Sequence, residues 1–295
     1  MRMTFAGLAG SAAVAALAAA AAVVLSGDAF ARDQIRIVGS STVYPFTTAV
    51  AEQFGKTGAG KTPVVESTGT GGGMKLFCAG VGEAHPDLTN ASRAMKKGEF
   101  EDCQKNGVKD IVEIKVGIDG ITLAQSKAGP AMKLTMEQVF LALADLQKSD
   151  AKAFEKVWKS IRKDGAYVEA GENDNVIVQK LEANKNAFGI FGYSFLEENT
   201  AKLKGVPIDG AEATYDNISS GKYKGARPLF VYVKKQHVGV IPGIDKFVAE
   251  YVSSKALSKD GYLARKGLVA LPKGEIDKVM AGAKEMKVLS ASDVH

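Results

Sequence analysis

The sequence predicts an α/β protein. From Gln34 onward, short apolar runs typical of strands alternate with amphipathic runs of helical periodicity. The first two of these strand-like runs each end in a loop of glycines and hydroxyl side chains. Because the alternation of strands and helices favours right-handed βαβ units, we expect a largely parallel sheet with helices packed on it.

The first part of the chain, up to residue 124, carries most of the predicted strands. The apolar segment 118–124 is expected to be extended, with a bend or a close backbone approach at Asp119 and Gly120. The other strands are predicted at 35–38, 62–66, 87–91 and 111–116, with helices at 46–54, from 74 to 78 and at 97–106.

After Leu134 the helical patterns become longer. Thr135 is a candidate N-cap for a helix that continues through Leu143, because a threonine oxygen can accept a hydrogen bond from a first-turn amide. The remaining predictions are helices at 151–161 and 174–181, the latter capped by Asn173 or Asp174, strands at 187–195 and 228–234, and helices beginning at Ile244 and Lys259.

The first 31 residues have the features of an export signal. Arg2 is positive, residues 12–25 form an almost unbroken apolar run, and residues 29–31 match the A-x-A pattern of a signal-peptidase site. We therefore expect cleavage near Ala31, a mature chain that begins at Arg32, and a periplasmic location. A membrane anchor is the alternative, although the apolar run is dominated by alanine.

Cysteine usage agrees with an exported protein. Cys78 and Cys103 are the two cysteines, 25 residues apart, and they can close a loop in an oxidising compartment. Two separate buried thiols are the alternative. No metal site is expected, because two thiols are too few and the three histidines show no ligand spacing.

The charge of the chain gives little support to nucleic-acid binding. The formal net charge is +5, and the lysines are spread along the sequence. A solvated surface accounts for most of them, so no nucleic-acid partner is expected.

Two loops have the composition of an oxyanion site. They span Gly39–Thr42 and Ser67–Gly73, each between a predicted strand and a predicted helix. Such junctions bring unpaired backbone N–H groups, hydroxyls and the positive end of a helix dipole to one point. Small residues also let the backbone approach a ligand closely. Glycine-rich turns that bind nothing are the alternative.

A third hydroxyl and a guanidinium follow the predicted strand 87–91. Ser92 offers the hydroxyl, and Arg93 can present a two-point fork to a tetrahedral oxyanion. A helix start with a solvated arginine is the alternative. Together with the two glycine loops, the pair favours an anion site.

The signatures of several other functions are missing from the sequence. Met74 occupies the second glycine position of the G-x-x-x-x-G-K-S/T loop and the last glycine position of the G-x-G-x-x-G pattern, and Leu76 replaces the hydroxyl residue of the former. Neither G-x-S-x-G nor H-E-x-x-H occurs. A hydrolase of phosphate esters with Ser41 or Thr70 as nucleophile would lack an evident base or metal, so no catalytic residue is expected.

Four segments together resemble the periplasmic phosphate-binding proteins of Pst-type ABC importers. They are residues 39–46, 66–73, 91–93 and 188–195, and the likeness extends over nearly all of the mature chain. The resemblance implies a type II periplasmic-binding-protein fold, with two α/β lobes joined by crossing strands. It further implies a monomer without a cofactor that captures inorganic phosphate between the lobes and delivers it to a membrane permease.

By motif position, the resemblance implies ligand contacts from all three loops. The first loop would contribute Ser41, Thr42 and Val43, the second Thr70, Gly71 and Gly72, and the third Ser92 and Arg93. Many family members carry an aspartate where Arg93 stands, and that aspartate accepts a proton from the ligand. Sulfate, molybdate or no useful ligand at all are therefore alternatives to phosphate.

The resemblance also implies the boundaries of the lobes and a missing segment. Lobe one would comprise residues 32–117 and 228–295, and lobe two residues 118–227. The family's second lobe supplies an arginine and a Ser-Gly-Thr loop after the helix near 139–143, whereas residues 144–160 contain neither. The second lobe is therefore shortened, and half of the usual anion cage lacks its family residues.

Overall fold

A mixed seven-stranded sheet organises the protein in the computed structural model, which describes residues 32–144, 161–168 and 174–294. The strand order is β2-β1-β3-β7-β4-β5, and β6 pairs with β4 outside this path. The strands are β1 (Arg36–Gly39), β2 (Val64–Ser67), β3 (Leu88–Ala91), β4 (Ile111–Ser126), β5 (Phe188–Gly192), β6 (Leu203–Gly205) and β7 (Ala226–Lys234).

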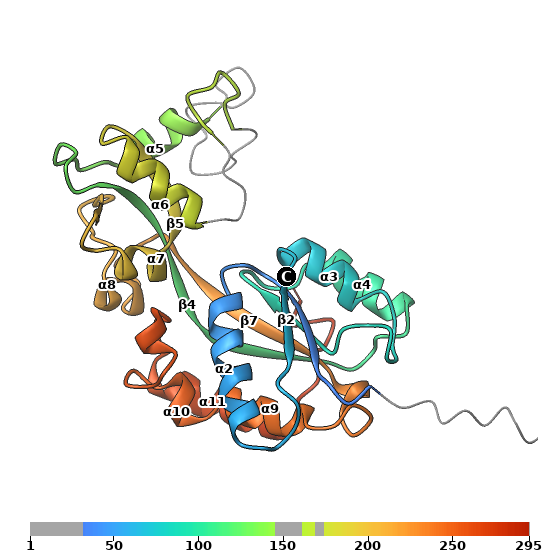
Figure 1. Cartoon of the computed structure of the whole chain (residues 1–295). Helices are drawn as coiled ribbons and strands as arrows, with labels where there is room; N and C mark the ends of the chain where they lie inside the picture. The colour runs from blue at the N-terminus through green and yellow to red at the C-terminus, as the bar shows by residue number, and fades with distance from the viewer. Residues whose placement is uncertain (1–31, 145–160, 169–173, 295) are drawn as a thin grey trace, which may run out of the picture.

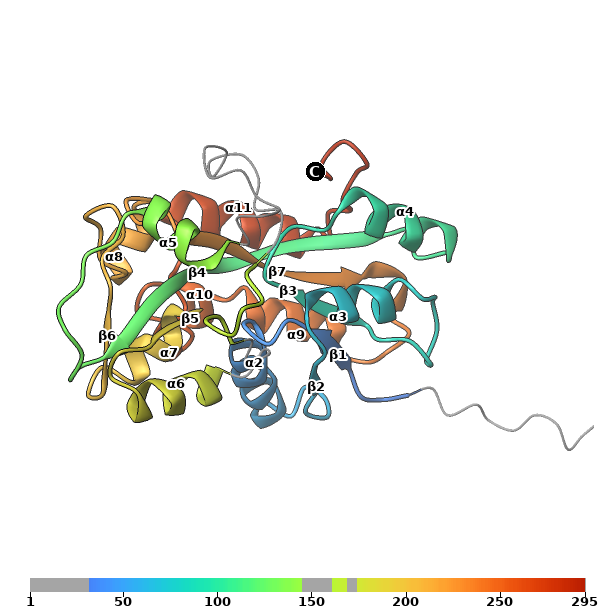
Figure 2. The same cartoon turned by 90° about the horizontal axis from the view of Figure 1, so that it is seen from above.

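Helices cover the sheet on both sides (Figures 1 and 2). Those in the first part of the chain are α2 (Tyr44–Lys56), α3 (Thr70–Phe77), α4 (Lys97–Lys105) and α5 (Met136–Leu143). Those in the second part are α6 (Asp174–Ala183), α7 (Tyr193–Glu198), α8 (Tyr215–Ser219), α9 (Ile244–Tyr251), α10 (Ser254–Leu257) and α11 (Lys273–Lys284), with short 3-10 helices η2 (Lys235–His237) and η3 (Ala264–Lys266). None of the helices in these ranges has the length and apolar character needed to cross a bilayer.

The prediction of a largely parallel sheet is wrong. Strand β1 lies parallel to both β2 and β3, as βαβ units require, but every pairing of β4 and β7 is antiparallel. The reason is the route of the chain, which leaves the first three strands along β4 and returns along β7. Figure 1 shows these two long strands running between α5 to α8 at one end and α2, α3 and α9 at the other.

A bend or a close approach to the backbone was expected at Asp119 and Gly120. Strand β4 runs through this position, and the approach to Gly120 is close, since a Cβ there would lie 2.5 Å from the Ile218 Cδ1. Its ladder with β7 has an irregularity between Lys115 and Gly117, just before Asp119. Ile118 lies opposite Pro228 in the register, but its backbone groups bond to another segment: the Ile118 amide donates to the Val269 carbonyl at 2.8 Å, and the Val269 amide donates to the Ile118 carbonyl at 3.2 Å. A segment near the C-terminus thus braces the middle of the crossing strands.

The largest core lies beneath the first strands. Helix α2 places Phe46, Val50 and Phe54 four residues apart on one buried face, as a helix with 3.6 residues per turn requires. These side chains pack with apolar residues of β1, β4, β7 and α9. Smaller clusters form under α3 and α4 and around β5 and α6, so apolar packing is present at both ends of β4.

Most predicted elements are present near their expected positions, and Thr135 is confirmed as an N-cap, since its oxygen accepts from the Gln138 amide at 3.1 Å. Three predictions of the position of a helix or strand are wrong. Helix α3 begins at Thr70 rather than Met74, the strand predicted at 187–195 ends at Gly192, and no helix begins at Lys259. The predicted helix at 151–161 lies almost wholly outside the described residues.

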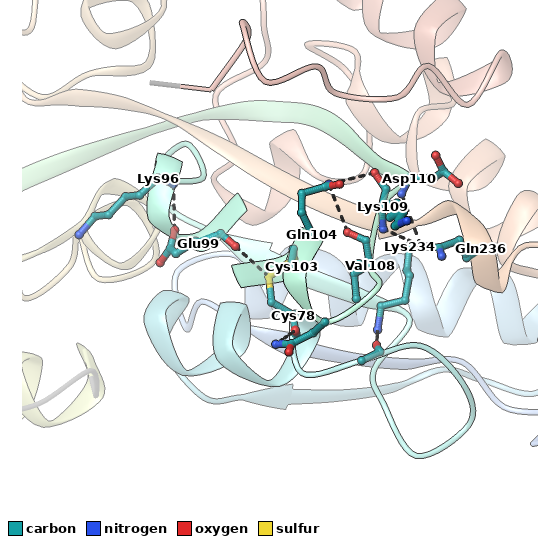
Figure 3. The surroundings of a disulfide bond; sticks show 12 residues. Cys78, Lys96, Glu99, Cys103, Gln104, Val108, Lys109, Asp110, Lys234 and Gln236 are labelled. Atoms are coloured by element: carbon teal, nitrogen blue, oxygen red, sulfur yellow. Dashed lines mark hydrogen bonds between the residues drawn. A yellow bond between two sulfur atoms is a disulfide. The ribbon is translucent and has the colours of Figure 1, made fainter. Parts of the chain in front are cut away.

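A disulfide joins the C-terminal end of α3 to α4 (Figure 3). It links Cys78 and Cys103, whose Cα atoms are 4.1 Å apart. Both residues are buried in the cluster that includes Met74, Phe77 and Phe100. The cross-link therefore fixes α4 against the helix that carries the second glycine loop.

Candidate functional site

The first loop turns sharply out of β1 at Gly39. Its φ is +125°, and a Cβ there would lie 2.2 Å from the Asn90 carbonyl oxygen, so only glycine fits. The Ser40 amide donates to that same oxygen at 3.0 Å, and the Ser40 carbonyl accepts from the Tyr44 amide, where α2 begins. Ser41 and Thr42 are half-buried between these fixed points, and Val43 is buried.

The second loop leads directly into the first turn of α3. Gly69 has a φ of +72°, and the helix starts at Thr70, so the three following glycines are helical. The first-turn N–H groups of a helix have no intrahelical partner, and the helix dipole makes this end attractive to anions. The open N-terminal turn of α3 is therefore a suitable anion-binding surface.

The three glycines of α3 differ in whether packing requires a residue without a side chain. A Cβ on Gly73 would lie 2.4 Å from the Gly39 Cα, so Gly73 permits close contact between the helix and β1. A Cβ on Gly71 would meet nothing within 4 Å, and one on Gly72 would only contact the Thr68 side chain at 3.6 Å. Packing explains Gly73 but not Gly71 or Gly72, which leave the helix terminus open.

The third loop lies against the second. The Ser92 amide donates to the Thr70 hydroxyl oxygen at 3.2 Å, and the two hydroxyl oxygens are also 3.2 Å apart. Thr70 and Ser92 come from different strand-to-helix junctions and are both half-buried. The structure therefore brings together two of the predicted site residues.

Arg93 follows Ser92, but its guanidinium is directed to α4. Its two terminal nitrogens donate to the two Glu99 carboxylate oxygens at 2.7 and 2.8 Å. Glu99 also accepts from the Lys96 amide, which caps the start of α4. Burial disfavours the Glu99 carboxylate, but the hydrogen bonds from Arg93 and Lys96 hold its pKa below the ordinary value. The charge of Arg93 is thus matched by a carboxylate.

Another arginine, which the sequence patterns did not indicate, contacts the first loop. Arg227 of β7 donates to the Thr42 hydroxyl at 3.2 Å and to the Asp119 carboxylate at 3.3 Å. Asp119 and Arg227 are directly opposite each other in the β4–β7 ladder. The only signal in the sequence was the expected irregularity at Asp119 and Gly120, which pointed to the backbone and not to a charge pair.

The two members of this pair differ in their exposure to solvent. The Asp119 side chain is 4% exposed, whereas that of Arg227 is 34% exposed. Burial raises the pKa of Asp119 to about 6, and the nearby Arg227 charge opposes the rise. Asp119 accepts the Arg227 hydrogen bonds from the buried side of the pair.

The sheet register places these groups along one edge. Gly39 is level with both Ser67 and Asn90, so all three loops leave the carboxyl ends of β1, β2 and β3 together. Phe230 lies opposite Ala91 in antiparallel β7, which places Arg227 beyond the end of β3, on the side where Ser92 emerges. This is the edge at which α/β sheets usually bind ligands.

Within the described ranges, no group of three or more histidine, cysteine, aspartate or glutamate side chains is arranged to hold a metal ion. The hydroxyls and amides of the three loops and the positive end of the α3 dipole are suited to binding a small anion. A mixed sheet with two long crossing strands and three such loops defines a solute-binding class of protein.

Comparison with known proteins agrees with this class. The family model for the PBP superfamily domain matches residues 26–154 and 142–255. Protein SphX of Synechococcus elongatus is 31% identical over 79% of this chain and 76% of its own length. The phosphate-binding protein PstS of Staphylococcus saprophyticus is 30% identical, with 80% and 79% covered.

A solved structure extends the likeness to three dimensions. A possible phosphate-binding protein from Planctomyces limnophilus superposes with a TM-score of 0.61 at 29% identity, covering 86% of this chain and 98% of that one. The fold is accordingly that of the periplasmic binding proteins. The chain belongs to the PBP superfamily and, within it, to the family of Pst-type phosphate-binding proteins.

Proposed function

We propose that this protein captures inorganic phosphate in the periplasm and delivers it to the permease of an ABC importer. The observation that carries the proposal is the meeting of three hydroxyl-bearing loops at one sheet edge, with the Ser92 amide bonded to the Thr70 hydroxyl. Relatives named as phosphate-binding proteins support the choice of anion.

Binding requires no covalent step. The proposed ligand-binding residues are Ser41, Thr42 and Val43 of the first loop, Thr70, Gly71 and Gly72 of the second, and Ser92 of the third. Arg93 was also predicted, but its guanidinium is held by Glu99 in the structure. Hydroxyls and first-turn amides donate to the phosphate oxygens, and the open terminus of α3 adds its dipole. The protein acts as a carrier and not as an enzyme.

Closure of two lobes over the ligand completes the mechanism. Lobe one comprises residues 32–117 and 228–295, lobe two comprises residues 118–227, and the crossing strands β4 and β7 act as the hinge between them. Helices α5 to α8 lie at one end of β4 and β7, and α2, α3 and α9 lie at the other, which supports this division (Figure 1).

We further propose that the exported protein is a monomer whose leader is removed near Ala31.

Calorimetric titration of the purified exported protein with phosphate, sulfate and molybdate tests the proposal. We expect one phosphate per chain and weaker binding of the other two anions. Saturation by sulfate or molybdate without phosphate binding would assign the protein to another oxyanion. Heat from none of the three would identify a degenerate member of the family.

The rival function as a hydrolase has a separate test. The Thr70 oxygen contacts only Ser92 groups among the described hydrogen bonds, and neither of these is a base. We expect no turnover of a chromogenic phosphate ester. Turnover that Thr70→Ala or Ser41→Ala abolishes would replace the carrier with an enzyme.

A further inference from the structure

Three loops contribute hydroxyls and amides to the anion site, and a cation would add a stronger, charge-assisted hydrogen bond to a phosphate that carries one to two negative charges. Arg93, the predicted cation, is held by Glu99 in a two-point ion pair. The arginine of the family's second lobe has no counterpart in residues 144–160. The source of positive charge in this chain is therefore unassigned.

Arg227 has the position that such a cation needs. Its side chain donates to Thr42, a residue of the first loop, at 3.2 Å. The other arginines that the structure describes outside the loops contact groups elsewhere, as Arg162 does with Asp164 and Arg265 with the Asp260 carbonyl. Arg227 also lies on the side of β7 that extends past the end of β3, near the third loop.

Some N–H groups of Arg227 are hydrogen-bonded within the protein, and others remain available for a ligand. Nε and Nη2 donate to Asp119, and Nη2 also donates to Thr42. Nη1, with two N–H groups, has no hydrogen bond among the described residues, and the side chain is 34% exposed. A guanidinium has five donors in a fixed plane, so anchoring one edge leaves the rest oriented toward a ligand.

Asp119 holds this orientation from the buried side. Its side chain is 4% exposed and lies directly across the ladder from Arg227, so both side chains emerge on one face of the sheet. Pro228 follows Arg227 and restricts that residue to an extended backbone. The guanidinium is thus held by backbone, carboxylate and hydroxyl together before any ligand arrives.

We propose that Arg227 is the cationic ligand of the bound oxyanion in this protein, and that Asp119 is the residue that positions it. The inference rests on the proposed function and deepens it. The positive charge then comes from the crossing strand β7 rather than from the segment that is missing. An anion that reaches Arg227 contacts the first loop through Thr42 and one of the two crossing strands at the same time.

Titration of the full exported protein with phosphate tests the inference, with Arg227→Gln, Arg227→Lys, Arg93→Gln and Arg265→Gln as variants. We expect Arg227→Gln to weaken phosphate affinity about 10- to 100-fold, the range of a charged hydrogen bond. Arg227→Lys should retain part of the affinity, since the charge remains and the planar fork is lost. Arg265→Gln removes the same charge from an exposed site and should bind like wild type. Circular dichroism of each variant confirms folding.

A double-mutant cycle tests the role of Asp119. Asp119→Asn should weaken phosphate binding in the wild-type background but have little effect in the Arg227→Gln background, because a positioning residue acts through its partner. Equal losses in both backgrounds would overturn the positioning role.

Three further results would overturn the inference. Unchanged phosphate affinity in folded Arg227→Gln would exclude Arg227 as a ligand. A loss confined to Arg93→Gln would return the role to the third loop. Failure of wild type to bind any of phosphate, sulfate and molybdate would overturn the proposed function itself, and the wild-type titration alone reveals that case.

Discussion

At the scale of single residues, Gly72 is a position where a larger side chain can obstruct the ligand without disturbing the packing of the fold. Its added Cβ would meet only Thr68, at an ordinary contact distance of 3.6 Å. Lys75, one turn further along α3, is exposed. If backbone amides bind the anion, bulk at Gly72 obstructs the ligand, whereas the flexible lysine contributes little.

We therefore expect Gly72→Val to weaken phosphate binding by about 1–3 kcal/mol, the loss expected when hydrogen bonds to the ligand are no longer formed. Lys75→Ala should change the binding free energy by less than about 0.5 kcal/mol, as is usual for an exposed charge. Calorimetric titration measures both, and thermal melting serves as the folding control. A larger effect of the lysine substitution would indicate a point-charge site in place of an amide site.

Lys234 gives a pH dependence that has nothing to do with the ligand. It is fully buried in β7, donates to the Gly80 carbonyl at 2.6 Å, and lies 4.9 Å from the centre of the Phe77 ring. Burial lowers the pKa of Lys234 to about 8, although the charge of Asp87 opposes the shift. The folded protein therefore loses this proton at a lower pH than the unfolded chain does.

The sign of the effect on stability follows from linkage. Between pH 8 and the ordinary lysine value near 10.4, the unfolded chain binds more protons, so stability rises with pH by up to about 3 kcal/mol from this group. Urea unfolding at pH 7.5 and 9.5 should show the rise in wild type and a smaller rise in Lys234→Met. Lys75→Met is the exposed control and should behave like wild type. Identical pH slopes in Lys234→Met and wild type would contradict the assignment.

At the scale of elements, the disulfide between α3 and α4 is the clearest covalent constraint. It closes a loop with a sequence separation of 25 residues. Replacing both cysteines by alanine should lower the free energy of unfolding by about 3 kcal/mol, mainly because the unfolded chain gains freedom. Urea unfolding measures the loss, and wild type in reductant should approach the variant. Thiol titration of unfolded, unreduced protein should find no free thiol; two free thiols would refute the bond.

Most elements with a strong local pattern were predictable from the sequence, and the failures have local causes. Helix α11 was missed because Gly274 and Gly282 interrupt a weak, charged pattern. The aromatic run 187–195 has strand composition throughout, yet Gly192 serves as the N-cap of α7 and ends the strand there. Strand β6 has three residues, too few for any periodicity to be visible.

The parts of the site that are short continuous segments were predictable from the sequence. The contacts between residues far apart in the sequence were not. Each glycine and hydroxyl loop is a short continuous segment between a strand and a helix, so composition alone marks it. The pair of Asp119 and Arg227 spans 108 residues and depends on the antiparallel register of β4 and β7. The partner of Arg93 was also hidden, because a chain fragment does not reveal whether Glu99 or a ligand takes the guanidinium.

At the scale of the whole molecule, the proposed closure of two lobes predicts a motion about the crossing strands. Helices gather at both ends of β4 and β7, and the binding loops lie where the two groups approach each other (Figure 1). Phosphate should draw the groups together, because it makes more contacts with both groups in a closed form than in an open one. Small-angle X-ray scattering should give a smaller radius of gyration with saturating phosphate than without it.

The variant Arg227→Gln is the control for this closure. At phosphate concentrations that saturate wild type, it should keep the larger radius. An unchanged radius in phosphate-saturated wild type would mean that binding proceeds without closure of the lobes.

The exchange of hydrogen bonds between Ile118 and Val269 has a consequence for measuring such motion. The Ile118 N–H donates to the Val269 carbonyl, and the Ile118 carbonyl accepts from the Val269 amide. Deuterium uptake at Ile118 therefore reports the opening of the C-terminal segment, whereas uptake at neighbouring β4 amides reports the opening of the β4–β7 ladder. Comparing the two uptake rates shows whether the C-terminal segment or the β4–β7 ladder opens first.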